Sequence, residues 1–300
     1  MITTRAFMDQ TWIDMSSPTR DEVDSIVLTQ NISPIIAKDL LSPTPSQYTE
    51  VDGQMIYTVL HVPTLSRSHI AQDFQEIDFI ISENSVITAR YDSIDALHYF
   101  AKQAEVSEIL NKDEKSHLFF SIMKEIYRGI VDELSYLEDW MKEIEKNIFE
   151  GREKEMVGTI SDAGRNILNF KRMIDPHGAM FELLKTTGKI KFGDEFGLEA
   201  ITFEEEWRHT MKRITDQMDL VMELRETNNS LLSAKQNEIM KQLTIIGSIL
   251  LPLTMVSQLF GMSIVNFPLK ENPFAFWIIL GIMAGVMIVT FTYAKIKKWM

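Results

Sequence analysis

Two apolar runs near the end of the sequence constrain this chain more than any other feature. Leu243 to Phe260 holds 18 consecutive residues without a charge, and Phe274 to Tyr293 holds 20. A bilayer core about 30 Å thick needs about 20 apolar residues at helical rise, with about 17 as the lower limit. Both runs therefore predict transmembrane helices, at about 243–260 and at 274–293, rather than a hairpin buried in a large soluble core. The 13 residues between them, 261–273, predict a tight outer loop.

Basic residues beside these runs predict their orientation. Lys241 precedes the first run, and Lys295, Lys297 and Lys298 lie in the short basic tail 294–300 after the second. Lysine and arginine near the ends of membrane spans favour the cytoplasmic side. We therefore expect a multi-pass protein of the cell membrane (inner or plasma membrane) with both termini and the tail in the cytoplasm.

The charge of the rest of the chain limits its partners. The sequence carries 30 basic and 43 acidic residues, and 243–300 contribute only four lysines and one glutamate, which leaves 26 basic and 42 acidic residues before Leu243. This excess of negative charge argues against nucleic acid, or an anionic lipid surface, as a partner of residues 1–242. A solvated acidic surface explains most of the excess, although it could also attract cations.

No motif in the sequence predicts an enzyme. The chain has no cysteine, which excludes disulfides, thiolate zinc sites and cysteine nucleophiles. Its six histidines are scattered without the spacing of metal ligands. The sequence has no glycine-rich phosphate loop, hydrolase nucleophile elbow or HExxH motif. We therefore expect no catalytic residue and no covalent cofactor.

The first hundred residues, 1–100, predict a cytoplasmic α/β domain. Short helices are expected at 19–29 and 32–41, the first with a capping box formed by Thr19 and Glu22. β-branched and apolar runs separated by turn signals predict strands. These strands are expected at 55–62, 74–81 and 85–89.

The next hundred residues, 101–201, predict a cytoplasmic helical region. Apolar residues recur at steps of three and four between 95 and 149, opposite a charged face, which is typical of a packed amphipathic helix. A second helical stretch is expected over 153–185, interrupted near Pro176. Breaks are then expected at 186–188 and 192–194.

The longest predicted element is a stalk helix over 202–260 that continues into the first membrane span. From about Phe203 onward the sequence has no glycine before Gly247 and no proline before Pro252. One helix of about 58 residues is on the order of 87 Å long. Because an isolated helix of this length is not stable alone, it must pack against other helices, within the chain or in an oligomer.

One side of the first span carries small, hydroxyl and amide side chains at helical spacing. Such a stripe is costly against lipid but is useful at a helix interface or along a wet pore, and periodicity alone does not choose between these two roles. The stripe consists of Asn237, Met240, Gly247, Leu251, Thr254, Gln258 and Gly261.

The same stretch carries the resemblance to a known family. The run NEIMKQLTIIGSILLPLTMVSQLFGMS, residues 237–263, resembles the first membrane helix of the CorA family of magnesium and other divalent-cation transport proteins. NPFAFW, a second span and a terminal KKW then follow, as in that family. The likeness in element order extends over the whole chain, whereas the specific motifs lie in the last 64 residues or so.

The resemblance implies a homopentamer in the lipid bilayer, whose first spans line a pore for divalent cations. Magnesium is implied as the main substrate and as a regulatory ligand that closes the channel from the cytoplasm, at sites that no motif fixes in this sequence. The outer triplet Gly261, Met262 and Ser263 is implied as the selectivity filter. The implied pore-lining residues are Asn237, Met240, Leu243, Gly247, Leu251 and Thr254.

The sequence departs from the family at the filter, where the usual signature is Gly-Met-Asn and this chain has Ser263. A serine hydroxyl still hydrogen-bonds a hydrated ion, but it is shorter than an amide. Two alternatives to magnesium transport therefore stay open: selectivity shifted to zinc, cobalt or nickel, or a non-conducting regulatory membrane protein of the same fold. Acidic residues, among them the run Glu204 to Glu206, could supply regulatory sites, although a solvated face is the simpler interpretation of each.

Overall fold

The computed structural model describes residues 1–7, 9–64, 74–92, 94, 96–102, 116–261 and 273–296. These residues form two compact units, Met1–Arg225 and Glu226–Met300, and each is described by itself. The expected outer loop lies almost wholly outside the described residues, as do the last four residues of the tail.

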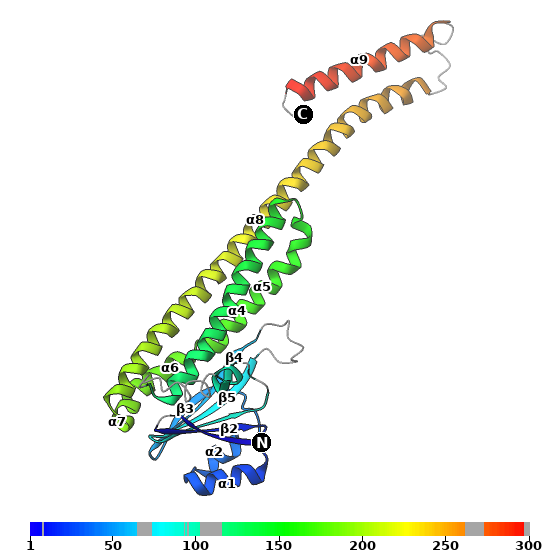
Figure 1. The fold of residues 1–300 in the computed structure, drawn as a ribbon. Coiled ribbons are helices and arrows are strands. Elements are labelled where there is room, and N and C mark those ends of the chain that lie inside the picture. The colour runs from blue at the N-terminus through cyan, green and yellow to red at the C-terminus, as the bar shows by residue number, and fades with distance from the viewer. Residues whose placement is uncertain are drawn as a thin grey trace. The chain divides into compact units, whose positions relative to one another are not determined.

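The first unit is built on a six-stranded sheet with the order β1-β2-β6-β5-β4-β3 (Figure 1). Neighbouring strands are antiparallel except β2 and β6, which are parallel. The strands are β1 (Ile2–Phe7), β2 (Gln10–Ser16), β3 (Tyr48–Asp52), β4 (Met55–Pro63), β5 (Phe74–Ile81) and β6 (Ser85–Arg90). The three predicted strands are confirmed as β4, β5 and β6.

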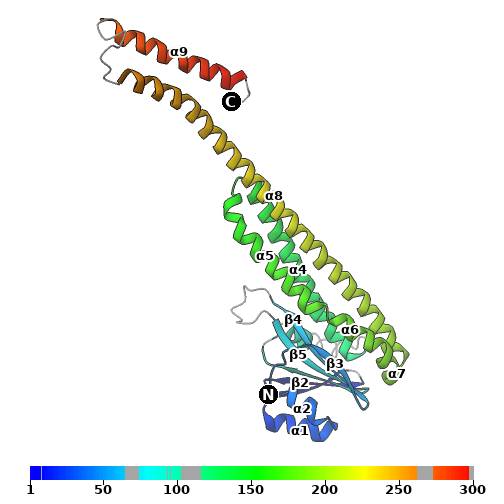
Figure 2. The same cartoon turned by 180° about the vertical axis from the view of Figure 1, so that it is seen from behind.

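Two short helices, α1 (Arg20–Gln30) and α2 (Pro34–Asp39), cover one face of the sheet (Figures 1 and 2). The predicted capping box is confirmed: the Thr19 backbone N–H donates to the Glu22 carboxylate at 2.9 Å, and the Glu22 N–H donates back to the Thr19 hydroxyl. Apolar side chains of α1 and α2 close a core against β2, β4, β5 and β6. Its fully buried members include Met15, Val23, Ile36, Leu40, Tyr57, Val59 and Ala89.

The opposite face of the sheet packs against a helical hairpin of α4 (Leu118–Phe149) and α5 (Glu153–Ile174). Phe79 of β5 meets Phe119 of α4 edge to face, with ring centroids 5.2 Å apart. Buried side chains recur along α4 at three- and four-residue steps, as its sequence pattern predicts. These are Ile130, Leu134, Leu137, Met141, Ile144 and Ile148.

The break expected at 186–188 is wrong. After α5, the chain forms α6 (His177–Leu183), a π-helical turn (Leu184–Gly188) and α7 (Lys189–Phe192) without leaving the helical path. The turn widens where Gly188 packs directly against the Phe196 ring, at a position where a Cβ atom has no room. The real break is at Gly193, whose φ of 99° is open to glycine but strained for other residues.

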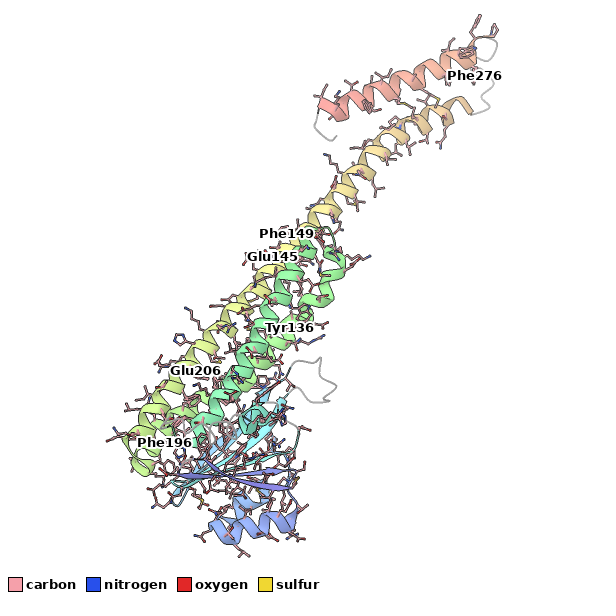
Figure 3. The ribbon with its side chains drawn as sticks, viewed as in Figure 1. Tyr136, Glu145, Phe149, Phe196, Glu206 and Phe276 are labelled. Carbon is pink, nitrogen blue, oxygen red and sulfur yellow. The ribbon has the colours of Figure 1, made fainter. Side chains whose placement is uncertain are left out.

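Helix α8 (Asp194–Gly261) begins directly after this break rather than near residue 202, and helix α9 (Ala275–Ile296) ends the described chain. In the first unit, α8 is anchored by buried Phe196, Phe203 and Ile214, and by Trp207, whose indole N–H donates to the Ile174 carbonyl at 2.8 Å. Figure 3 labels Phe196 and Glu206 on this part of α8, and Phe276 at the start of α9.

Candidate functional site

The second unit carries the two apolar runs as helices, the end of α8 and all of α9. Both are long and apolar enough to cross a membrane. Hydroxyl side chains in α8 bond back to its own carbonyls: Thr244 to Met240 at 2.8 Å, Ser248 to Thr244 at 2.7 Å, and Thr254 to Leu251 at 2.8 Å. Such bonds satisfy the hydroxyls without water, which suits a helix in lipid.

Helix α9 lies beside the end of α8 and covers one side of it (Figures 1 and 2). The Ser257 hydroxyl contacts the Met283 sulfur at 3.8 Å. On α9 the partly buried residues are Ala275, Ile279, Met283, Val286 and Thr290, which fall at three- and four-residue steps. The centre of the covered side of α8 consists of Ile245, Ile249, Pro252, Leu253 and Val256.

The opposite side of α8 is uncovered in the protomer. Leu251 is 71% exposed, Leu243 57% and Met240 55%, and Asn237, Thr254 and Gln258 are exposed as well. At Gly247 an added Cβ atom meets nothing within 4 Å. At about 100° per residue, this uncovered side lies opposite the centre of the side that α9 covers.

All six residues expected to line a pore therefore share one face of a single helix; five of them are exposed, and Gly247 is partly buried but has open space where a Cβ atom would lie. Of the expected filter, Gly261 is the last residue of α8, whereas Met262 and Ser263 lie outside the described residues. The spacing in the sequence was enough to find the face. It did not reveal that α9 covers the opposite side, or the Ser257–Met283 contact, because α9 is apolar on all sides.

The acidic run at 204–206 places its three carboxylates in different surroundings. Glu204 is only 7% exposed and accepts from both Lys185, at 2.8 Å, and Arg208, and these hydrogen bonds lower its pKa. Glu205 faces Arg208, and burial raises the pKa of Glu206. The interpretation as a solvated face is therefore wrong for Glu204.

Among the residues that the structure describes, no three His, Asp or Glu side chains are placed to hold a metal ion together. The six residues of this face of α8 carry no carboxylate, so its polar groups are a neutral amide and a hydroxyl; exposed Glu238 lies about 100° round the helix from Asn237. This chemistry suits contact with a hydrated ion, or with other helices, better than tight metal coordination.

Comparison with known proteins decides the family. The model of the CorA-like Mg2+ transporter protein family matches residues 9–296. The chain belongs to the CorA family. It is therefore a divalent metal ion transporter, a membrane protein with two C-terminal spans, and not an enzyme.

Two CorA relatives and one solved structure extend over nearly the whole chain. The cobalt/magnesium transport protein CorA of Thermotoga maritima is 23% identical over 296 residues, covering 97% of this chain and 83% of that protein. The cobalt/magnesium transport protein CorA of Methanocaldococcus jannaschii is 24% identical over 294 residues, covering 94% of this chain and 88% of that protein. The complete structure of the CorA magnesium transporter from M. jannaschii matches with a TM-score of 0.85 at 20% identity, covering 97% of this chain and 92% of that one.

The CorA fold is thus established for this chain: an N-terminal α/β domain, a long stalk helix and C-terminal apolar helices. Divalent cations are its transported substrates as a family property. Similarity to CorA also implies assembly with further copies of the chain.

Proposed function

We propose that this CorA protein is a homopentameric channel that passes hydrated divalent cations, with magnesium as its main substrate. The observation that carries the proposal is the uncovered face of α8, which holds every expected pore residue and lies opposite the side that α9 covers. In a ring of copies, such a face lines the axis while α9 forms the outer layer.

The chemistry of this face fits a strongly hydrated ion. Magnesium releases its water shell reluctantly, so it is best admitted hydrated, by rings of neutral oxygens. Asn237 and Thr254 supply such rings, and Gly247 leaves room beside the axis. Met240 and Leu251 supply apolar rings that gate the pore by drying. The absence of carboxylates from the face allows quick release of the ion.

The filter is proposed at Gly261, Met262 and Ser263. Ser263 is also the observation that favours a second candidate function, because a shorter side chain with one oxygen contacts a hydrated ion differently from asparagine. In that case the same pore selects zinc, cobalt or nickel. If the pore does not conduct, the protein is a regulatory membrane protein of the same fold.

Orientation and gating complete the proposal. Lys241 and Lys295 at the span ends favour both termini in the cytoplasm of a cell whose inner or plasma membrane holds the protein. Cytosolic magnesium then closes the channel by binding between copies.

The test is magnesium uptake into liposomes that hold the purified protein, with Ser263→Asn as the matched variant and empty liposomes as the control. Uptake by both proteins supports serine as a working filter residue. Uptake only by Ser263→Asn supports the shifted selectivity, which zinc, cobalt and nickel uptake then measures. No uptake of any of these metals by either protein, with pentamers present, contradicts the channel.

A further inference from the structure

The first unit contains a buried carboxyl group that the transport function does not use. Asp78 lies in the middle of β5 and is 0% exposed. Its Oδ2 atom lies 3.3 Å from the Tyr91 hydroxyl, and its Oδ1 atom has no hydrogen-bond partner among the described residues. A carboxylate usually stays ionised inside a protein only when it accepts two or three good hydrogen bonds or faces a cation.

Two other buried carboxylates of the same sheet show what Asp78 lacks. Glu76 accepts the Thr44 backbone N–H at 2.9 Å on both oxygens, and lies 3.2 Å from a ring nitrogen of His61. Asp14 accepts the Thr88 hydroxyl at 2.8 Å and pairs with the Arg90 guanidinium at 3.0 Å. Among the described residues, Asp78 has one long hydrogen-bond contact, from Tyr91, with the Tyr57 hydroxyl as the next nearest donor, and no cation is placed against it.

Of the groups near Asp78, the carboxylates of Glu76 and Asp39 add negative charge, whereas the Tyr91 and Tyr57 hydroxyls can donate to it. These groups come from several elements: Glu76 on β5, Tyr57 on β4, Asp39 at the end of α2, and Tyr91 after β6. Behind them, His61 on β4 contacts Glu76, and Tyr48 and Glu50 on β3 lie near Asp39. The Asp78 register partners Val59 and Ala89, and Val23 and Ile26 of α1, are apolar. Burial and the nearby Glu76 raise the pKa of Asp78 well above the ordinary aspartate value.

Counting hydrogens at Tyr91 gives a second, geometric argument. The Tyr91 hydroxyl lies 2.9 Å from the Asp39 carbonyl oxygen and 3.3 Å from Asp78 Oδ2. A hydroxyl has one hydrogen to donate, whereas a carbonyl and an ionised carboxylate only accept. Both contacts become full hydrogen bonds if Asp78 carries a proton, because its carboxyl group then donates to Tyr91 and Tyr91 donates to Asp39.

We propose that Asp78 holds a proton in the folded protein and that this proton latches α2 to the sheet through Tyr91 and the Asp39 carbonyl. When the proton is lost, the Tyr91 hydrogen turns to the new carboxylate and the Asp39 carbonyl loses its donor. The new charge then lies near the carboxylates of Glu76 and Asp39. The α1–α2 layer opens to admit water, so the first unit responds to rising pH.

The test is hydrogen exchange of the α1–α2 amides in the full-length protein in detergent, between pH 6 and pH 9, after correction for intrinsic exchange. If opening of the α1–α2 layer releases one proton, its equilibrium constant rises about tenfold for each pH unit. This holds between the ordinary aspartate pKa and the raised pKa of folded Asp78. We expect protection of α2 to fall with this slope in the wild type. Protection that does not change with pH overturns the proposal.

Two variants distinguish loss of the Asp78 proton from a general destabilisation of the α1–α2 layer. Asp78→Asn keeps the shape and donates to Tyr91 at every pH, so α2 should stay protected from pH 6 to pH 9. Tyr91→Phe removes the donor to Asp39, so α2 should be weakly protected throughout. An Asp78→Asn protein with the wild-type slope contradicts the proposal.

A measurement on the wild type keeps the test valid even if a variant fails to fold. The infrared carbonyl band of a protonated carboxylic acid should be present in the full-length protein at pH 7, shielded from deuterium exchange, and should disappear only at the pH where the slope of α2 protection levels off. A spectrum without such a band at pH 7 overturns the proposal.

Discussion

The substitution Gly178→Ala tests how Trp207 of α8 packs against α6 in the first unit. Gly178 lies in the first turn of α6, where an added Cβ atom would be 2.5 Å from two carbons of the Trp207 ring. Carbon atoms in contact prefer about 3.5–4.0 Å, so Gly178→Ala requires a movement of about 1 Å. The ring is not free to move, because its N–H donates to the Ile174 carbonyl at 2.8 Å.

The free energy of unfolding should therefore fall. Overpacking of this kind costs about 1–3 kcal/mol, and loss of the indole hydrogen bond adds about 1 kcal/mol. The better helix propensity of alanine offsets up to about 1 kcal/mol. The net loss is about 1–3 kcal/mol. Gly158→Ala is the matched control, because Gly158 is exposed in the interior of α5 and its Cβ atom would meet nothing within 4 Å. It should gain about 0.5–1 kcal/mol.

The assay is thermal unfolding of the full-length protein in detergent, followed by near-ultraviolet circular dichroism. For a unit of this size, 1 kcal/mol shifts Tm by about 2–4 °C, so Gly178→Ala should lower Tm by about 2–12 °C while Gly158→Ala raises it slightly. In a Trp207→Phe background the cost of Gly178→Ala should shrink. An unchanged or higher Tm for Gly178→Ala, or the same loss in both backgrounds, would refute the reasoning.

Two further predictions concern assembly and pH. The chain has no cysteine, so single-cysteine variants can be cross-linked in membranes. Leu251→Cys and Thr254→Cys should cross-link between copies, whereas Ile249→Cys, on the side that α9 covers, should not. Equal cross-linking at all three positions contradicts the pore face. Burial lowers the pKa of His177 to about 4 from an ordinary value near 6.5. As pH drops from about 6.5 to 4, the unfolded chain therefore protonates this histidine before the folded protein does, and the free energy of unfolding should fall. Thermal unfolding of His177→Gln, with exposed His209→Gln as the control, should show a weaker dependence on pH between about 6.5 and 4 only for the first variant.

The sequence predicts three of the four inner strands of the sheet and misses the fourth, β2, although β2 is buried over most of its length. β4, β5 and β6 are rich in β-branched and aromatic residues and lie between turn signals, which identifies them even though β5 also carries Gln75, Glu76 and Asp78. β1 and β3 were not predicted, because they are edge strands with polar and charged residues such as Arg5 and Glu50. Their strand character comes from pairing with β2 and β4, which a local pattern does not contain.

The candidate site was predictable to a similar degree. The spacing of Asn237, Gly247 and Thr254 along α8 identifies one face, because polar and small residues are rare in an apolar run. The sequence did not predict which side of α8 is covered by α9. Because α9 is apolar on all sides, its pattern does not show which of its faces packs against α8. Gly188 looked like a helix end although it only makes room for the Phe196 ring. The start of α8 at Asp194 was also missed, although a break was expected at 192–194, since Gly197 near that start is a poor helix former.

The parallel pairing of β2 with β6 has a consequence for biosynthesis. Thr11 pairs with Ser85, so the N-terminal hairpin of β1 and β2 has no neighbour until β6 has left the ribosome. Two-stranded hairpins are marginally stable in water, so the sheet closes only when this late strand arrives. About 150 residues then separate β6 from the first membrane span, which corresponds to on the order of ten seconds of translation. The sheet therefore has time to fold before the translocation machinery receives its first apolar helix.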